Sequence, residues 1–337
     1  MKFKAVALIG AAALALVAGS ASAGDLACLI TKNNTNPFFV KMKEGAEAAA
    51  TAAGLDFQAY AGEKDGDAAP QITAIENCVA AGAKGILITP SNDSVGPALK
   101  DARAAGILVI ALDTPLADTE AQDITFATDN FEAGLLIGKW AAATMGEGAA
   151  TAKIAMLDIN KDNISVDVAR DTGFLVGFGI EVPDLKVMGS ETDARVIGHE
   201  TSDANPEGGL RAMETLLAKD PDINVVYTIN EPAAEGAFQA LKNAGKEGQA
   251  IIVSVDGGCP GVASVKSGVI GATSQQYPLL MASKGIEAIV AFAKDGTKPT
   301  VTEGLSFFNT GVNLVTDKPA EGVPSIDTTK GTELCWG

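Results

Sequence analysis

The sequence is poor in the residues and motifs on which most catalytic and metal sites depend. Histidine occurs once, as His199, in a polar stretch that is typical of a solvated loop. One histidine cannot build a histidine-rich metal centre or an HExxH helix. The GxSxG, GxGxxG and P-loop motifs of hydrolases, dinucleotide-binding proteins and NTPases are also absent. We therefore expect no enzymatic activity, no cofactor and no metal site.

Basic charge and aromatic residues are scarce as well. The 25 lysines and arginines are outnumbered by 42 acidic residues, which gives a formal net charge of −17. Such a protein is not built to bind nucleic acid or anionic membrane surfaces. Aromatic residues make up 5% of the chain and hydrophobic residues 47%, a composition typical of a globular helix-and-sheet protein. With 337 residues, the chain is long enough for two domains.

A long apolar run occurs at the N-terminus, at Ala5–Ala18. It follows Lys2 and Lys4 and is followed by the small residues Ala21-Ser22-Ala23. This order is typical of a secretory signal peptide, and the run is too short for a comfortable transmembrane span. We predict a signal peptide at residues 1–23 and an exported mature chain that is not inserted in the membrane.

The four cysteines contain no CxxC pair, which argues against redox catalysis and a zinc knuckle. In an oxidising compartment, an even number of cysteines indicates disulfides. Of the three possible pairings we favour Cys28–Cys78 with Cys259–Cys335, because the second bridge would hold an otherwise loose tail. Four buried free thiols are the alternative.

Helices that end in Ala-Gly, apolar strands and polar turns alternate along the chain. Glycine after a helix is the left-handed C-cap, and continuous apolar strands are buried on both faces. Alternating helices and strands predict parallel sheets with right-handed crossovers. We expect one sheet from Leu26 to about Ala127 and a second α/β unit from near residue 130. The expected strands of the second unit include Lys153–Asp158, Leu185–Gly189, Val225–Ile229 and Ala250–Val255.

Polar residues stand where these strands end. Asp113 follows Ile107–Leu112, and Asp256 follows Ile251–Val255. Because the carboxyl ends of parallel strands share one edge of a sheet, these side chains should converge on one crevice. The set comprises Asp113, Arg170, Asn230, Asp256 and Gln276, to which the turn residue Asn36 is added. Carboxylates, a guanidinium and amides together suit a neutral, hydroxyl-rich ligand. The alternative for each residue is an ordinary helix cap or turn.

The stretch Asn36-Pro37-Phe38-Phe39 lies between an apolar strand, Leu26–Ile30, and a helical pattern, Met42–Ala53. Proline suits the first helical turn, and the asparagine can cap the helix or present its amide to a ligand. Neighbouring residues on a helix point about 100° apart, so both rings should not face the core. One alternative is core packing of both rings, and the other is an aromatic floor for a sugar.

At these residues the sequence resembles the periplasmic sugar-binding proteins of ABC transporters, of the ribose-binding type. The resemblance rests on Asn36-Pro37-Phe38-Phe39, Leu112-Asp113, Asn230, Asp256-Gly257 and Gln276, and it extends from roughly Leu26 to Asp317. It implies a type I periplasmic binding protein with two Rossmann-like, three-layer α/β domains, parallel sheets and a three-crossing hinge. The implied lobes are residues 24–128 plus 277–306 and residues 129–276 plus 307–337.

The resemblance also implies a function for these residues. A monosaccharide would bind in the cleft between the lobes and pass to an inner-membrane permease, with the protein acting as a periplasmic monomer. A chemoreceptor is a second implied partner. The implied ligand-binding residues are Asn36, Phe38, Phe39, Asp113, Arg170, Asn230, Asp256 and Gln276.

Two departures bear on the identity of the sugar. Thr114 stands where ribose binders carry an arginine, and Ala204-Asn205-Pro206 stands where a second stacking aromatic is expected. Asp113-Thr114-Pro115-Leu116 and Cys335-Trp336-Gly337 resemble the fructose-binding branch instead. We expect fructose, with ribose, another monosaccharide or a sugar alcohol as alternatives. Other possible functions are a sugar-sensing regulator domain, a sugar-processing enzyme, and a chemotaxis or autoinducer-type receptor.

Overall fold

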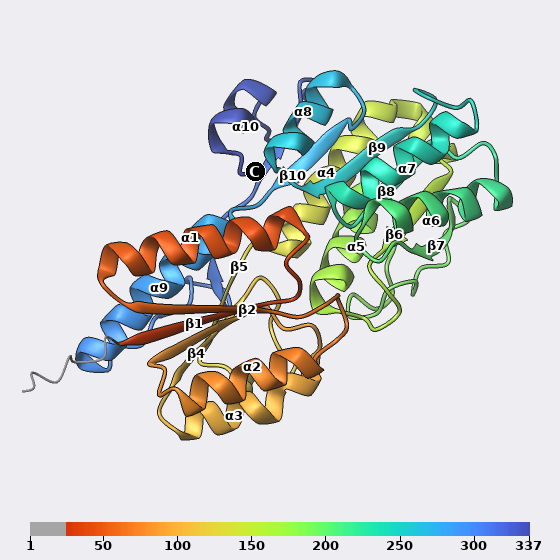
Figure 1. The fold of residues 1–337 in the computed structure, drawn as a ribbon. Helices are drawn as coiled ribbons and strands as arrows, with labels where there is room; N and C mark the ends of the chain where they lie inside the picture. Colours follow the sequence, from red (N-terminus) through yellow and green to blue (C-terminus); the bar gives the residue numbers. More distant parts are fainter. Residues whose placement is uncertain (1–24) are drawn as a thin grey trace, which may run out of the picture.

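The computed structural model describes residues 25–337, which form two α/β lobes (Figure 1). The expected signal peptide lies outside the described residues. The first lobe has the sheet order β2-β1-β3-β4-β5-β11, and the second has the order β7-β6-β8-β9-β10-β12. All strand pairs are parallel except β10 with β12. The expected fold class of two Rossmann-like lobes is therefore confirmed, with one antiparallel strand added.

The elements of the first lobe come from residues 26–127 and from a second segment, residues 278–309, where the chain returns to this lobe. Its strands are β1 (Leu26–Thr31), β2 (Asp56–Ala61), β3 (Gly85–Ile88), β4 (Leu108–Leu112), β5 (Ile124–Ala127) and β11 (Phe308–Asn309). Its helices are α1 (Pro37–Ala53), α2 (Ala69–Ala80), α3 (Gly96–Ala104) and α9 (Pro278–Asp295), with short 3-10 turns at Asp93–Val95 and Thr119–Ala121.

The second lobe follows the same plan. Its strands are β6 (Ile154–Asp158), β7 (Val196–Thr201), β8 (Val225–Thr228), β9 (Ile251–Asp256), β10 (Ala272–Gln275) and β12 (Asn313–Val315). Its helices are α4 (Asn130–Met145), α5 (Ser165–Phe178), α6 (Pro206–Lys219), α7 (Glu231–Asn243), α8 (Cys259–Ser267) and α10 (Thr328–Leu334), with a 3-10 turn at Gly146–Thr151.

Each sheet is covered by helices on both faces, as the continuous apolar strands predicted. In the first lobe, α1 and α9 cover one face and α2 and α3 cover the other (Figure 1). Along β1, Ala27 and Leu29 pack in the first of these layers, whereas Cys28 and Ile30 pack in the second. In the second lobe, α4 and α5 lie over one face and α6 and α7 over the other. The strand ends are thus held between two buried layers, which fixes the residues that follow them.

The chain passes between the lobes three times, between β5 and α4, between β10 and α9, and between β11 and β12. One boundary differs from the expectation. Phe308 and Asn309 pair with Phe126 and Ala127 of β5, so they belong to the first lobe, whereas the sequence placed residues from 307 onward in the second lobe. The strand has only two residues, which is too short to leave a recognisable pattern.

One expected strand of the second lobe is wrong. Residues 185–189 form turns, and Leu185 and Val187 are among the more exposed large hydrophobic residues of the described chain. The strand at this position in the sheet is β7 (Val196–Thr201), which lies at the sheet edge and is half-buried along its length. His199, expected in a solvated loop, therefore lies on a strand, with 21% of its side chain exposed.

Helices α4 and α5 pack so closely that their backbones touch. A Cβ atom on Gly138 of α4 would lie 2.2 Å from the carbonyl oxygen of Phe174 on α5. A Cβ atom on Gly173 of α5 would lie 2.3 Å from the carbonyl oxygen of Phe131. Only glycine allows this approach at both positions. The contact sets the position of α5, whose first two turns face the cleft.

Both disulfides favoured from the sequence are present in the structure. Cys28 of β1 is bonded to Cys78 of α2, because odd and even positions of β1 face opposite layers and position 28 faces α2. Cys259, at the start of α8, is bonded to Cys335 in the C-terminal tail. The described residues include no free cysteine. The second bridge holds the last residues of the chain against the second lobe.

Candidate ligand-binding site

All eight predicted ligand-binding residues line one cavity between the two lobes. Asn36, Phe38, Phe39 and Asp113 come from the first lobe, and Arg170, Asn230, Asp256 and Gln276 come from the second. The cavity is narrow, with a volume of about 40 Å³. It lies at the carboxyl ends of β4, β8, β9 and β10, where open α/β sheets bind ligands. The structure therefore brings together residues that are up to 240 positions apart in sequence.

Phe38 and Phe39 both line the cavity and both pack in the core. Their side chains are only 4% and 6% exposed, and they belong to the cluster between α1, α9 and the sheet. The two rings meet edge to face, with centroids 5.5 Å apart. The expectation that only one neighbour could be buried was wrong, because Trp336 from the C-terminal tail covers Phe38 at a centroid distance of 5.5 Å. The two rings therefore pack in the core and also border the cavity, and their contact with a sugar stays a prediction.

Arg170 is the central donor of the cavity. Its Nε donates to Asn130 Oδ1 at 2.7 Å, one terminal nitrogen donates to the Ile229 carbonyl at 3.1 Å, and the other donates to Gln276 Oε1 at 3.0 Å. That last nitrogen also lies 3.7 Å from Asp113 Oδ1 in the opposite lobe. A guanidinium has five N–H groups, so two remain for a ligand. The side chain is held in position by its own lobe before any ligand arrives.

The two aspartates of the cavity differ in their surroundings. Asp113 accepts a hydrogen bond from the Thr114 hydroxyl at its Oδ2 atom, whereas its buried Oδ1 atom accepts none from the described part of the chain. Asp256 accepts a hydrogen bond from Gln276 Nε2 at 2.9 Å. Burial raises the pKa of Asp256 to about 7, although Arg170 and Gln276 oppose the change. Asp256 is therefore partly protonated near neutral pH.

Glu231 lies close enough to Asp256 for the charge of one carboxylate to affect the pKa of the other. The carboxylate accepts hydrogen bonds from the backbone N–H groups of Gly257 and Gly258 and from the Thr273 hydroxyl. Burial, and then the negative charge of Asp256, raise the pKa of Glu231 to about 8. Ionisation of Asp256 therefore disfavours ionisation of Glu231, and Glu231 holds the turn that follows Asp256.

Comparison with known proteins identifies the family. The family described as periplasmic binding protein domain matches residues 27–298. The ribose import binding protein of Escherichia coli K12 is 31% identical over 286 residues, which is 84% of this chain and 90% of that protein. The corresponding protein of Haemophilus influenzae is 32% identical over 285 residues, 84% of this chain and 91% of its own.

This chain is a periplasmic binding protein. The resemblance to the ribose-binding type that the sequence indicated is confirmed, and so is the expectation that the protein is not an enzyme. A solved solute-binding protein of an Agrobacterium vitis ABC transporter, with bound D-fucose, has a TM-score of 0.75 and 25% identity. It covers 92% of this chain and 100% of its own. Among the helices of residues 25–337, none combines the length and apolar character needed to cross a membrane.

In this periplasmic binding protein, the alternative of helix capping also holds for two of the cavity residues. Asn36 caps α1 by accepting from the Phe38 N–H at 3.0 Å. Asn230 caps α7 by accepting from the Ala233 N–H at 3.1 Å, and its Nδ2 atom donates to the Ala204 carbonyl. Capping fixes each amide at the cavity wall, so the two roles are compatible.

Sequence reasoning missed a charged pair in the cavity. Lys32 follows β1 directly, its side chain is only 2% exposed, and its Nζ atom lies 3.3 Å from Asp65 Oδ1. The strand-end rule that found Asp113 could have found Lys32 as well. Ala204 lines the opposite wall, at the position where the sequence lacks the second aromatic. The remaining missed wall residues are Ile159, Val166 and Ile229.

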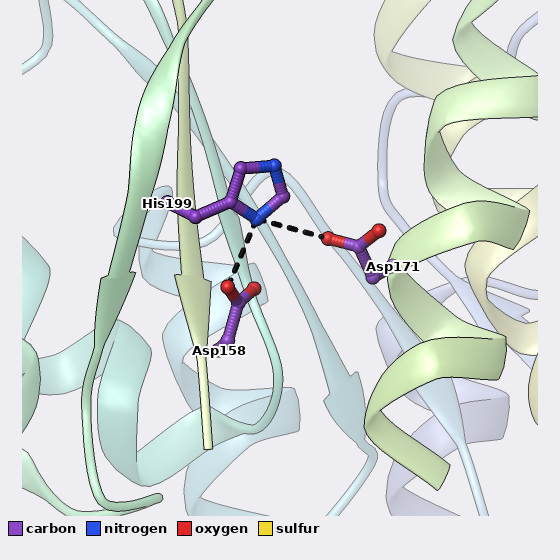
Figure 2. Close-up of side chains that lie close together, drawn as sticks. All are labelled: Asp158, Asp171 and His199. Carbon is purple, nitrogen blue, oxygen red and sulfur yellow. Dashed lines mark hydrogen bonds and ion pairs between the residues drawn. The ribbon is translucent and has the colours of Figure 1, made fainter. Parts of the chain in front are cut away.

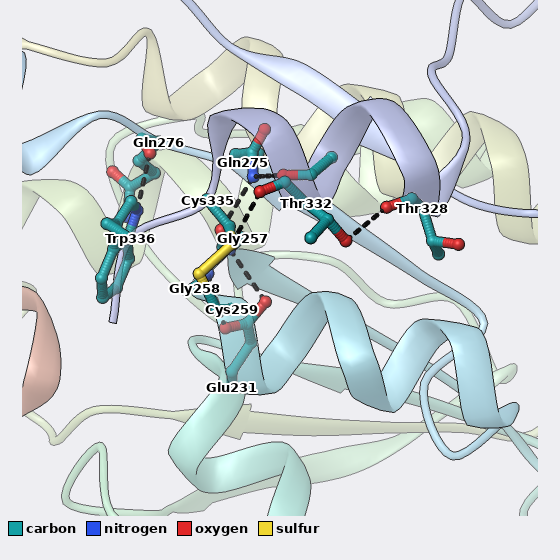
Figure 3. Close-up of a disulfide and its surroundings, with 11 residues drawn as sticks. Glu231, Gly257, Gly258, Cys259, Gln275, Gln276, Thr328, Thr332, Cys335 and Trp336 are labelled. Carbon is teal, nitrogen blue, oxygen red and sulfur yellow. Dashed lines mark hydrogen bonds between the residues drawn. A yellow bond between two sulfur atoms is a disulfide. The ribbon is translucent and has the colours of Figure 1, made fainter.

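The C-terminal tail contacts residues of the cavity wall. Figure 3 shows Trp336 beside Gln276, whose carbonyl oxygen accepts a hydrogen bond from the indole N–H at 2.8 Å. The Trp336 carbonyl accepts from the Cys259 backbone N–H, next to the disulfide with Cys335. Gln275, one residue before Gln276, donates to the carbonyls of Gly257 and Gly331. The tail therefore supports both the aromatic floor and the amide of Gln276.

Proposed function

We propose that this protein is a periplasmic receptor of an ABC importer for a monosaccharide. It binds the sugar between its two lobes and delivers it to the inner-membrane permease. The observation that carries the proposal is the convergence of eight residues from both lobes on one cavity. A ligand that contacts both lobes stabilises the closed form by its differential affinity for that form. Closure would be the signal that a permease recognises.

The polar groups of the cavity favour a neutral polyol. Asp113 offers an acceptor without a donor among the described residues, and Arg170 has two spare N–H groups. A sugar hydroxyl can satisfy both kinds of group, because it donates and accepts at once. An anionic ligand would instead meet the carboxylates of Asp113 and Asp256. Phe38 and Phe39 offer an apolar surface to the C–H face of a sugar ring.

Within the monosaccharides, we propose fructose as the first candidate and ribose or another monosaccharide as the second. The support for fructose is the sequence resemblance at Thr114 and in the tail, and the relatives named above leave the choice open. Lys32 and Asp65 add a charged pair at the first-lobe wall, where they can bind the hydroxyls that distinguish one sugar from another.

The deciding experiment is a sugar panel on the mature protein. Thermal shift with fructose, ribose, allose, fucose, galactose, glucose and xylitol should give a large rise for one or two sugars, because a bound ligand stabilises by RT ln(1 + [L]/Kd). The same sugars should reduce the radius of gyration in small-angle scattering as the lobes close. Stabilisation by none of them, at concentrations up to 10 mM (about 1,000 times a 10 μM Kd), would contradict the proposal.

A further inference from the structure

A second polar cluster lies in the second lobe, behind the wall of the sugar cavity. It is built by Asp158 at the end of β6, Asp171 on α5 and His199 on β7 (Figure 2). Pairing of β6 with β7 places His199 next to Met156, and α5 brings Asp171 from above the sheet. The three side chains come from three elements, and each has one ligating atom within 4.8 Å of the others.

Carboxylates approach both nitrogens of the imidazole, and two of them converge on one nitrogen. Both aspartates approach the same nitrogen, Nδ1, with Oδ2 atoms at 2.9 Å for Asp158 and 3.5 Å for Asp171 (Figure 2). Ligand atoms about 2.0–2.2 Å from a tetrahedral metal stand about 3.3–3.6 Å apart. The Asp171 separation matches this spacing, whereas Asp158 is at hydrogen-bonding distance and would move back by a few tenths of an ångström to share a metal. The other nitrogen, Nε2, lies 2.9 Å from Glu191 Oε1. A carboxylate on the second nitrogen is the usual way in which a ligating histidine is oriented.

The cluster gathers more acidic groups than basic ones, and several of their oxygens have no hydrogen-bond partner among the described residues. Asp158, Asp171 and Glu191 surround a single histidine, Asp167 lies near the two aspartates, and Asp171 is fully buried. Neither oxygen of Asp171 accepts a hydrogen bond from any described residue. The same holds for one oxygen each of Asp158, Asp167 and Glu191. Unpaired buried carboxylates point to a cation.

The cluster is open to solvent on one side. A cavity of about 340 Å³ is lined by Asp158 and His199 together with Asn160, Lys161, Glu200 and Thr201. A small ion can therefore reach the imidazole without unfolding the lobe. The sugar cavity does not share this opening, although Ile159 and Arg170, the neighbours of Asp158 and Asp171 in sequence, line the sugar cavity.

We propose that Asp158, Asp171 and His199 bind one divalent transition-metal cation of the zinc class, with Glu191 orienting the imidazole and water completing the coordination. Imidazole nitrogen together with carboxylates suits Zn²⁺, whereas Ca²⁺ and Mg²⁺ prefer sites made only of oxygen. The cation would provide a partner for the buried carboxylate oxygens that accept no hydrogen bond from the described residues. It would also fix α5 to β6 and to the edge strand β7 through Asp171, the residue that follows Arg170, whose side chain lines the sugar cavity.

The test uses the mature protein without a histidine tag, stripped with a chelator and dialysed. Isothermal titration with Zn²⁺, with Ca²⁺ and Mg²⁺ in parallel, should show one tight site for zinc and none for the other two ions. Mass spectrometry of the reloaded protein should find one zinc per chain. Asp171→Asn and His199→Gln should each weaken zinc binding at least about 100-fold, and Glu191→Gln should weaken it about 10–100-fold.

The control is Glu207→Gln, which changes an exposed carboxylate on α6 that is paired with Arg211 and does not line this cavity. It should leave zinc affinity within about threefold, as expected for an exposed ion pair. Unchanged zinc binding in both Asp171→Asn and His199→Gln would show that zinc binds elsewhere and would overturn the proposal. So would a stripped wild-type protein that takes up no zinc while circular dichroism shows it folded. Anomalous scattering at the zinc edge would place the ion directly, and an ion away from Asp158, Asp171 and His199 would overturn the proposal too.

Discussion

The replacement Arg170→Ala tests both the binding site and the support beneath it. The guanidinium uses three of its five N–H groups on Asn130, Ile229 and Gln276, all in the second lobe. If the other two donate to the sugar, each charge-assisted bond contributes about 1.5–3 kcal/mol, or about 3–6 kcal/mol together. At 1.4 kcal/mol per tenfold change, the affinity should fall by a factor of about 100 or more.

The same replacement should also destabilise the sugar-free protein. It removes the positive charge that faces Asp113 and Asp256 and leaves the acceptors on Asn130 and Gln276 unpaired. Removing one member of a buried charge network costs about 3–5 kcal/mol. The three contacts within the second lobe therefore predict a loss of stability in addition to the loss of affinity.

Two measurements separate these effects, with Arg211→Ala as the matched control. Arg211 lies on α6, is 54% exposed and pairs only with the surface carboxylates of Asp203 and Glu207 among the described residues. Urea unfolding without sugar gives the stability, and calorimetry with the best sugar of the panel, at a temperature where each variant is folded, gives the affinity. Arg211→Ala should change neither by more than about 1 kcal/mol. An affinity of Arg170→Ala within threefold of wild type would refute the role of Arg170 in binding.

Three further predictions concern pH, the tail and the helix contact. Because burial raises the pKa of Asp256 to about 7, sugar affinity should fall from pH 8 to pH 5.5, and calorimetry near pH 6 should detect proton release on binding. Neither effect should occur in Asp256→Asn. Since the folded-state pKa values of Asp256 and Glu231 lie above those of the unfolded chain, the unfolding free energy of the sugar-free protein should fall as pH rises from about 4 to 8. Cys335→Ser should lower the melting temperature and expose the C-terminal tail to protease. In the chain-entropy account, a disulfide that closes a loop of 76 positions contributes about 4 kcal/mol to stability. An unchanged melting temperature would contradict a stabilising role of the disulfide. Gly138→Ala should cost about 1–3 kcal/mol in urea unfolding by forcing α4 and α5 apart, whereas Gly148→Ala, whose added methyl meets nothing closer than 3.8 Å, should have little effect.

The residues of the cavity could be predicted from the sequence because a local pattern marks them. Asp113 and Asp256 each follow a continuous apolar strand, and a parallel sheet gathers such strand ends at one edge. The same rule applies to Lys32 after β1, but the rule alone does not tell a ligand-facing lysine from a solvated one. Its burial depends on Asp65, which comes from a loop with no pattern of its own.

The His199 cluster could not be predicted because no local pattern links its members. Asp158 and His199 are 41 positions apart, and they meet only because β6 and β7 pair. β7 is an edge strand with intermediate burial, so its sequence, with Gly198 and three polar residues, lacks the apolar run that marked the other strands. The more apolar stretch at residues 185–189 was taken for the strand in its place. An edge strand is therefore where a reading by hydrophobic pattern fails first, and any site built on it is lost with it.

The contacts of the cavity also distinguish the parts that the two lobes play in the proposed receptor. The second lobe supplies side chains that are already bonded to one another, since Arg170 binds Gln276 and Gln276 binds Asp256. The first lobe supplies Asp113, whose Oδ1 atom has only a distant charge partner, at 3.7 Å across the cleft. A preordered lobe loses little conformational entropy when a sugar binds to it. An unsatisfied buried acceptor on the other lobe gains a hydrogen bond only when the lobes close over a hydroxyl. Binding would therefore be supported mainly by the second lobe, and closure would be driven by the first.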